Sequence, residues 1–160
     1  MRNFVKESIE ETLKTTGYKL EEMTELESVM FRKSVLEKYT GGKDFRALWE
    51  VLEGSEFCIR DKNAWKWLDE FLLLDECYLF FDRGDDTSIY IFQENQSLTK
   101  FLSEFDGYIF YVTNKNLDFL ISFNDSDYLT AQGTAEPWLR NKAKELSKAG
   151  WVDMDGKSYL

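Results

Sequence analysis

The 160-residue sequence predicts one α+β domain built on an antiparallel sheet of five to six strands. Between residues 56 and 131, short runs of aromatic and β-branched residues alternate with turn residues, which is typical of sequential antiparallel strands. Helical periodicity marks both ends of the chain and one insertion. We therefore expect a meander sheet with N-terminal helices, an inserted helix and a C-terminal helix. The domain is expected to span residues 1–150, followed by a weakly structured tail over 151–160.

The first third of the chain is expected to be helical. Apolar residues recur at helical spacing over residues 3–16. Thr24 and Glu27 have the spacing of a capping box, in which each side chain bonds the other's backbone N–H, so a second helix should begin there. A short third helix is expected over residues 44–54.

The runs 77–82 and 87–93 flank a Gly/Asp turn, which predicts a β-hairpin. Side chains alternate between faces, so Tyr78 and Phe80 should oppose Leu79. Both faces are apolar, which indicates a strand covered on both sides, or covered on one side and binding something on the other. The remaining predicted strands span 56–60, 108–113, 118–123 and 127–131. The remaining predicted helices span 63–71, a segment that begins at Asn95 or Ser97 and ends at 105, and 134–150.

Charge is unevenly distributed along the chain. The net charge is −10, and residues 50–127 hold 17 Asp and Glu against 6 Lys and Arg, whereas the flanks hold 13 and 14. A nucleic-acid-binding protein usually carries an excess of positive charge on its binding surface, so no nucleic-acid partner is expected. The acidic centre favours a basic protein partner, with plain solubility as the alternative.

Two clusters of aspartates are candidate binding residues. Asp82, Asp85 and Asp86 lie at the hairpin turn, and Asp125 and Asp127 at a later turn. Aspartate is a common turn residue because its side chain bonds its own backbone. Such residues also form acidic rims that face a partner, or oxygen-rich metal sites. We expect no metal here, because neither cluster continues as a calcium-binding loop.

The aromatic residues of the strands are the other candidates. Tyr78, Phe80, Tyr90, Phe92 and Tyr111 are expected side by side on the sheet. They are either core beneath a helix or an exposed patch ringed by carboxylates, which is the composition of many protein interfaces. In the second interpretation the three tyrosines contact the partner.

Most enzyme signatures are absent. The sequence contains no histidine, which excludes the Ser-His-Asp triad, Cys-His catalysis and the usual zinc sites. It has neither a phosphate-binding loop nor a dinucleotide fingerprint, so no cofactor is expected. Cys58 and Cys77 lie in apolar runs and are expected to be buried and reduced. Because no long apolar run or secretion signal is visible, we expect a cytoplasmic protein without a membrane partner.

The order of these segments resembles that of a family of small, acidic bacterial proteins, and loosely that of the SUKH superfamily of immunity proteins, which neutralise bacterial toxins. The resemblance covers roughly residues 1–140 and is carried by aromatic structural segments. They are residues 47–50, 65–68, 78–82, 108–113, 120–124 and 127–133. The resemblance implies an α+β protein that binds another protein, such as a toxin nuclease. It implies no catalytic residues.

Two functions follow as hypotheses. The first is a non-enzymatic, immunity-type protein that binds a basic toxin domain through its acidic centre. The second is a carboxylate-based enzyme or small-ligand carrier, which requires a deep pocket with at least two converging acids, one with a strongly raised pKa.

Overall fold

The computed structural model describes residues 2–105 and 107–160, and it shows the predicted α+β fold. Within these residues one sheet of seven strands has the order β1-β4-β3-β5-β6-β7-β2, and every neighbouring pair is antiparallel. The strands are β1 (Leu20–Glu22), β2 (Glu56–Arg60), β3 (Cys77–Phe81), β4 (Tyr90–Phe92), β5 (Phe110–Thr113), β6 (Phe119–Phe123) and β7 (Tyr128–Gly133). All six strands expected from the sequence are present, and β1 is a seventh strand that the sequence does not predict.

The sheet is a meander only in part. Strands β5, β6 and β7 follow one another, and β3 pairs with β4 as the expected hairpin. The chain then crosses back through helix α4 (Leu98–Ser103), so that β5 pairs with β3. Strand β2 pairs with β7 at one edge, and β1 pairs with β4 at the other. The two edge strands therefore come from the N-terminal part of the chain.

Local sequence signals set the helix boundaries. Thr24 accepts a hydrogen bond from Glu27 N, and the Glu27 carboxylate accepts one from Thr24 N, which confirms the capping box. The expected third helix over 44–54 is only a 3₁₀ turn. The helices are α1 (Phe4–Thr16), α2 (Glu25–Tyr39), α3 (Leu68–Leu72), α4 (Leu98–Ser103) and α5 (Ala135–Lys148), with 3₁₀ turns η1 (Leu48–Val51) and η2 (Ala64–Trp67). No helix of the described residues is long and apolar enough to cross a bilayer.

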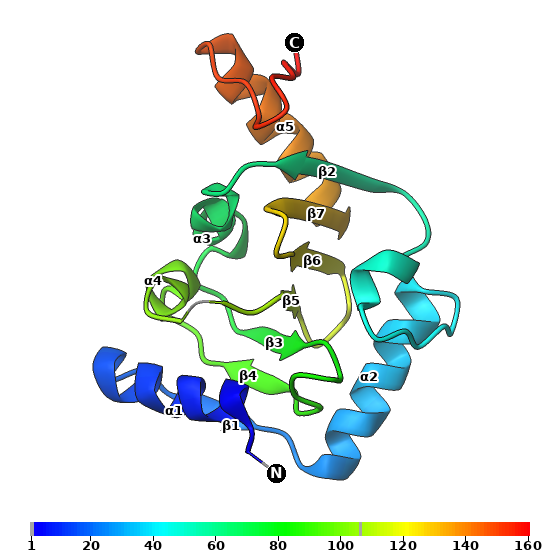
Figure 1. Cartoon of the computed structure of the whole chain (residues 1–160), viewed down its shortest axis with the longest axis vertical. Coiled ribbons are helices and arrows are strands. Elements are labelled where there is room, and N and C mark those ends of the chain that lie inside the picture. The colour runs from blue at the N-terminus through cyan, green and yellow to red at the C-terminus, as the bar shows by residue number, and fades with distance from the viewer. Residues whose placement is uncertain (1, 106) are drawn as a thin grey trace.

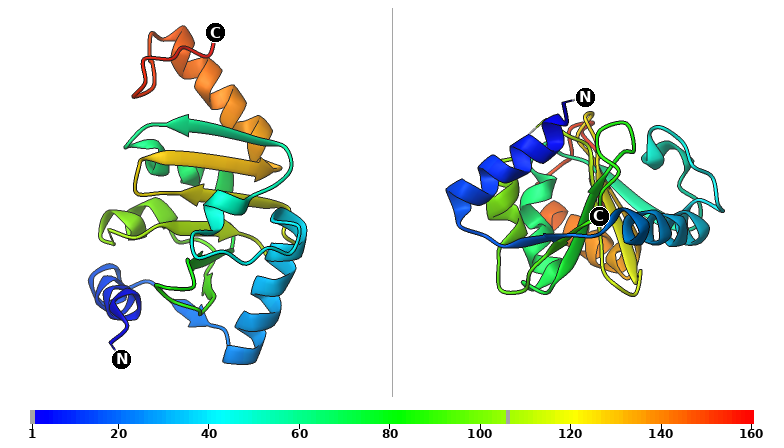
Figure 2. Two further views of the ribbon diagram at one scale, coloured as in Figure 1. Left: turned by 45° about the vertical axis from the view of Figure 1, so that its right-hand side comes forward. Right: turned by 90° about the horizontal axis from the view of Figure 1, so that it is seen from below.

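Helices cover both faces of the sheet (Figures 1 and 2). Helices α1, α3, α4 and α5 lie on one face over a large core that includes Leu79, Phe81 and Val112. Helix α2 and the segment after it cover the other face, over a smaller core that includes Phe80 and Tyr111. Strand β3 is therefore buried on both faces, as its two-sided apolar sequence predicts.

Helix α2 covers only part of this face of the sheet. A helix of 15 residues is about 22 Å long and strands are about 4.8 Å apart, so α2 spans only four or five strands. Its Ser28 accepts a hydrogen bond from Ile89 N beside β4, and its Tyr39 hydroxyl donates to Leu117 O beside β6. Of the described residues, none from β7 or β2 joins the smaller core. This face of β7 and β2 is left without a helix.

Residues 151–160 contain no helix or strand, but they are not weakly structured as expected. The Trp151 indole donates to Asp61 Oδ2 at 2.9 Å, and the Tyr159 hydroxyl donates to Asp153 Oδ2 at 2.6 Å. Met154 N donates to Arg60 O at the end of β2. Aromatic packing and turn hydrogen bonds therefore fix this segment against the edge of the sheet.

Candidate functional site: the acidic end of the sheet

Strand register brings the two aspartate clusters to the same end of the sheet. Phe81 pairs with Phe110, Phe110 with Phe123, and Phe123 with Leu129. The β3–β4 turn and the β6–β7 turn therefore leave the sheet at one end. Burial is the main cause of the raised pKa of Asp82, and the negative charge of Asp125 adds to it.

Asp82 is a structural residue. Its side chain is only 6% exposed, and Oδ1 accepts hydrogen bonds from Leu48 N at 2.9 Å and from the Tyr111 hydroxyl at 2.7 Å. The Tyr111 oxygen in turn accepts a hydrogen bond from Trp49 N at 3.0 Å. Burial raises the pKa of Asp82, and these hydrogen bonds oppose the rise. The carboxylate thus anchors η1 to the sheet.

Asp86 also has a structural role. It is 5% exposed, its Oδ1 accepts from Ser88 N at 3.1 Å, and its Oδ2 accepts from the Tyr90 hydroxyl. The expected partner-facing rim is therefore wrong for Asp82 and Asp86, because turn and strand groups occupy both carboxylates. Asp85, Asp125 and Asp127 remain accessible, the last of them half-buried.

Of the two interpretations of the aromatic residues, the structure shows the core and not the exposed patch. Tyr78, Phe80 and Tyr111 lie on the α2 face and are buried, with exposures of 0–6%. Tyr90 and Phe92 lie on the opposite face and are also buried. The reason is register: Leu79 pairs with Tyr90, which turns the aromatic residues of β4 towards the large core. None of the three tyrosines expected at a partner surface is available to a partner.

A hollow of about 390 Å³ lies on the face of β7 and β2 that α2 leaves uncovered. We call it the acidic hollow, because Glu50 and Glu56 line two of its sides. Two half-buried aromatic residues, Trp49 and Tyr128, supply flat apolar walls. Its lining residues are Trp49, Glu50, Glu56, Cys58, Asn124, Tyr128 and Thr130. Of the candidates named from the sequence, only the turn of Asp125 and Asp127 borders it.

The acidic hollow carries uncompensated negative charge. Within residues 2–105 and 107–160, no Lys or Arg forms an ion pair with Glu50, Glu56 or Asp125, and all three are exposed. Burial, together with the charge of Glu136, raises the pKa of Glu56. The nearby Arg60 is already engaged, since it donates to a turn carbonyl and pairs with Asp155 at 3.1 Å.

Cys58 lies in this hollow and is exposed, contrary to its expected burial, whereas Cys77 is buried as expected. The Thr130 hydroxyl donates to Cys58 Sγ at 3.3 Å. Although the residue is exposed, neighbouring atoms partly desolvate its thiol, which raises the pKa of Cys58 and keeps the thiol protonated at neutral pH. The Trp49 Nε1 atom is buried and has no hydrogen-bond partner among the described residues.

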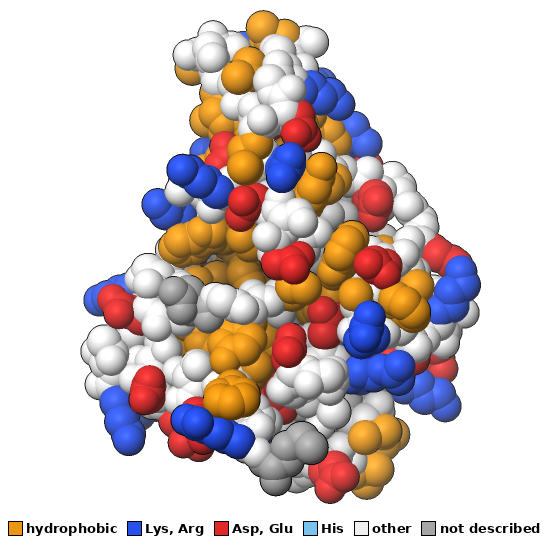
Figure 3. Space-filling view, in the orientation of Figure 1, with side chains coloured by type: hydrophobic (Ala, Val, Ile, Leu, Met, Phe, Trp, Pro, Cys, Tyr) orange, Lys and Arg blue, Asp and Glu red, His pale blue; other side chains and the backbone are white. Residues whose placement is uncertain are grey.

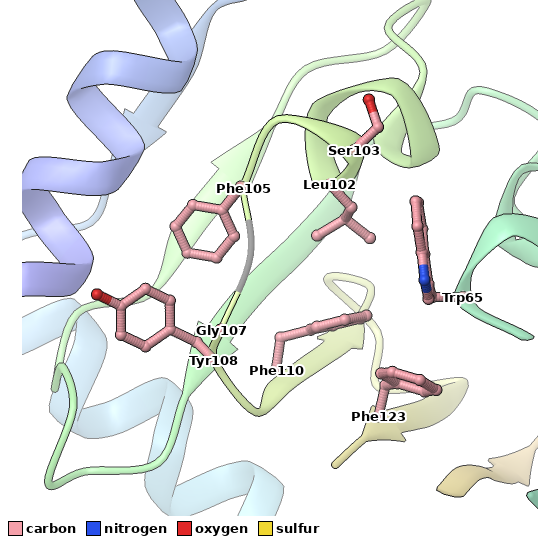
Figure 4. Close-up of a pocket in the computed structure, with 8 residues that line it drawn as sticks. All are labelled: Trp65, Leu102, Ser103, Phe105, Gly107, Tyr108, Phe110 and Phe123. Atoms are coloured by element: carbon pink, nitrogen blue, oxygen red, sulfur yellow. The ribbon is translucent and has the colours of Figure 1, made fainter. Parts of the chain in front are cut away.

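A second hollow, of about 190 Å³, opens on the opposite face of the same end. We call it the aromatic hollow; in Figure 3 it is the recess with orange walls left of the centre, and red side chains lie above and beside it. Its lining residues are Trp65, Leu102, Ser103, Phe105, Gly107, Tyr108, Phe110 and Phe123 (Figure 4). Phe123 lines this hollow and the next residue, Asn124, lines the acidic one, so the β6–β7 turn separates them.

No group of three His, Cys, Asp or Glu side chains in the described part of the chain is arranged to hold a metal ion. The aspartates are instead distributed over two turns, and Glu56 lies in β2 opposite Gln132, towards the other end of the sheet. Comparisons with protein-family models, curated proteins and solved structures find no match for this chain, so the resemblance to SUKH immunity proteins stays a prediction.

Proposed function

We propose that this chain is a non-enzymatic protein-binding module of the immunity type, which neutralises a basic bacterial toxin by covering it with the acidic end of its sheet. The observation that carries the proposal is the acidic hollow, in which exposed and unpaired carboxylates surround two aromatic walls. Protein interfaces combine aromatic anchors with a polar rim in this way.

The charges of the rim suit recognition of a cationic surface. Glu50, Glu56 and Asp125 come from three separate segments, so the negative charge is spread over a surface. Unpaired carboxylates attract a basic partner over a distance of about 10 Å at ordinary ionic strength. Their main effect is to raise the rate of association and to exclude acidic proteins.

The experiment compares two charge-reversal pairs of equal charge. The test pair is Glu50→Lys, at a residue that lines the acidic hollow, with Asp125→Lys, at the residue that follows the lining residue Asn124. The control pair is Glu10→Lys with Glu11→Lys, both exposed on α1. Each immobilised chain is exposed to lysate of the native host at low salt, and bound proteins are released by a salt gradient. The captured protein is then expressed with and without the chain.

The proposal expects one basic protein that the unmodified chain and the α1 control retain and the test pair does not. This protein should arrest growth when it is expressed alone, and the chain should restore growth. Equal capture by the test pair and the control, or a captured protein whose toxicity the chain does not relieve, would contradict the proposal.

The second function that the sequence leaves open, a carboxylate-based enzyme or small-ligand carrier, is favoured by the presence of Glu50 and Glu56 in one hollow and by the raised pKa of Glu56. Both side chains are exposed, however, and a general acid at neutral pH requires a strongly desolvated carboxyl group. An NMR titration of the Glu56 carboxyl carbon decides between them, because catalysis needs a pKa near 6–7 and binding does not.

A further inference from the structure

The aromatic hollow gathers rings from four segments of the chain. Trp65 comes from η2, Phe105 follows α4, Phe110 belongs to β5, and Phe123 ends β6 (Figure 4). The rings of Trp65 and Phe123 are half-buried, so the hollow is open to solvent on one side. In Figure 4 the Tyr108 hydroxyl points away from the other rings, which leaves its apolar ring as part of the wall.

Apart from Trp65, the rings of this hollow have no Lys or Arg of the described residues above them. In the described residues nine aromatic rings have a Lys or Arg above them, and Phe105, Tyr108, Phe110 and Phe123 are not among these. The one cation at the wall is Lys66, whose Nζ lies 5.6 Å from the centre of the Trp65 ring. Phe105 and Phe110 are buried against other rings, whereas Tyr108 and Phe123 are half-buried. Ring faces carry partial negative charge, so the rings of Tyr108 and Phe123 can still attract a cation.

Two exposed carboxylates are close in sequence to the lining residues, and acidic side chains lie above and beside the recess in Figure 3. Glu104 precedes Phe105, and Asp125 follows Phe123 by two residues; both are exposed, and neither forms an ion pair within the described residues. Ring faces and carboxylates together favour a positively charged group with an apolar stem. A neutral apolar group would gain nothing from the carboxylates.

The size of the hollow fits one side chain. Pockets for small molecules usually measure about 300–1,000 Å³, and this one measures about 190 Å³. We propose that the aromatic hollow binds a lysine or arginine side chain of the basic partner, with the stem against the rings and the charged group towards Glu104 and Asp125. This inference rests on the proposed function, because the acidic hollow lies at the same end of the sheet, across the β6–β7 turn.

The test uses small probes and needs no partner protein. The indole N–H signal of Trp65, assigned by its loss in Trp65→Phe, is followed by NMR during titration with n-butylammonium and, separately, with 1-butanol. The two probes have similar apolar stems and differ in charge. We expect saturable shifts with n-butylammonium and binding of 1-butanol that is weaker by about two- to thirty-fold, the range that one cation–π contact supplies.

Variants identify the source of the preference. Phe123→Leu keeps an apolar wall but removes a ring, so n-butylammonium should bind about two- to thirty-fold more weakly. Phe71→Leu is the matched control, because Phe71 is also half-buried and lies outside the hollow. Lys66→Met removes the neighbouring positive charge and should strengthen binding of n-butylammonium without affecting 1-butanol.

Equal binding of the two probes would overturn the inference, because the hollow would then select apolar groups. Failure of n-butylammonium to shift the Trp65 signal would also overturn it, as would equal weakening by Phe123→Leu and Phe71→Leu. None of these results touches the proposed function, which is judged by the capture and growth experiments with the acidic hollow.

Discussion

Substitution Tyr111→Phe tests the account of how the acidic end is built. The ring is fully buried and is stacked on Phe80 at 5.2 Å, so phenylalanine keeps the packing and removes only the hydroxyl group. That hydroxyl donates to Asp82 Oδ1 at 2.7 Å and accepts from Trp49 N at 3.0 Å. A buried polar group left without a partner costs about 1–3 kcal/mol. Asp82 keeps its bond from Leu48 N, so we expect a loss of about 2–4 kcal/mol in the free energy of unfolding.

The assay is equilibrium unfolding in urea, followed by tryptophan fluorescence. For an m-value of about 2 kcal/mol/M, the midpoint should fall by roughly 1–2 M. Tyr78→Phe is the matched control, because Tyr78 lies on the same face of neighbouring β3 and its hydroxyl makes no hydrogen bond within the described residues. It should change the free energy by less than about 0.5 kcal/mol. Equal effects of the two substitutions would refute the assignment of Tyr111 and Asp82 as the anchor of η1.

Three further predictions concern the rest of the fold. Gly133→Ala should destabilise the protein by about 2–4 kcal/mol in the same urea assay, because Gly133 has φ +64° and a new Cβ would lie 2.9 Å from Phe119 Cα; an unchanged midpoint would contradict this. The free energy of unfolding of Asp82→Asn minus that of the unmodified protein should increase as the pH rises from about 4 to about 7. Burial raises the pKa of Asp82, so the folded protein holds its proton more tightly than the unfolded chain and loses stability as that proton leaves; a difference that does not vary with pH would be evidence against it. Deletion of residues 151–160 should lower stability by roughly 3–5 kcal/mol, since two large aromatic side chains lose their packing, and a thermal midpoint equal to that of the full chain would contradict this.

The sequence predicts those parts of the fold that short-range patterns determine. The capping box of Thr24 and Glu27 places the start of α2, and the alternation along β3 assigns each of its side chains to the correct face. Both signals depend on neighbours within a few residues. Strand β1 was missed because it has only three residues and is ordered by pairing with β4.

The site depends on longer-range geometry, which the sequence does not carry in its local patterns. The β3–β4 connection is long, so the register of Tyr90 opposite Leu79 is set by packing rather than by a tight turn. The exposure of Cys58 follows from the length of α2, which ends before it reaches β7. The excess of negative charge between residues 50 and 127 remains a prediction of the binding surface. Asp82, which the sequence predicts as a binding residue, is buried and bonds Leu48 N and the Tyr111 hydroxyl.

The association rate constant between this chain and its captured partner tests the central claim most directly. It is measured from about 0.05 M to about 0.5 M salt, where the Debye length falls from roughly 14 to 4 Å. We predict that the association rate constant of the unmodified chain falls on the order of tenfold or more across this range. The rate constant of the double variant Glu50→Lys with Asp125→Lys should be low at the lowest salt concentration and should change little as salt is added. Equal rate constants for the two chains at every salt concentration would contradict the claim that the acidic end binds the partner.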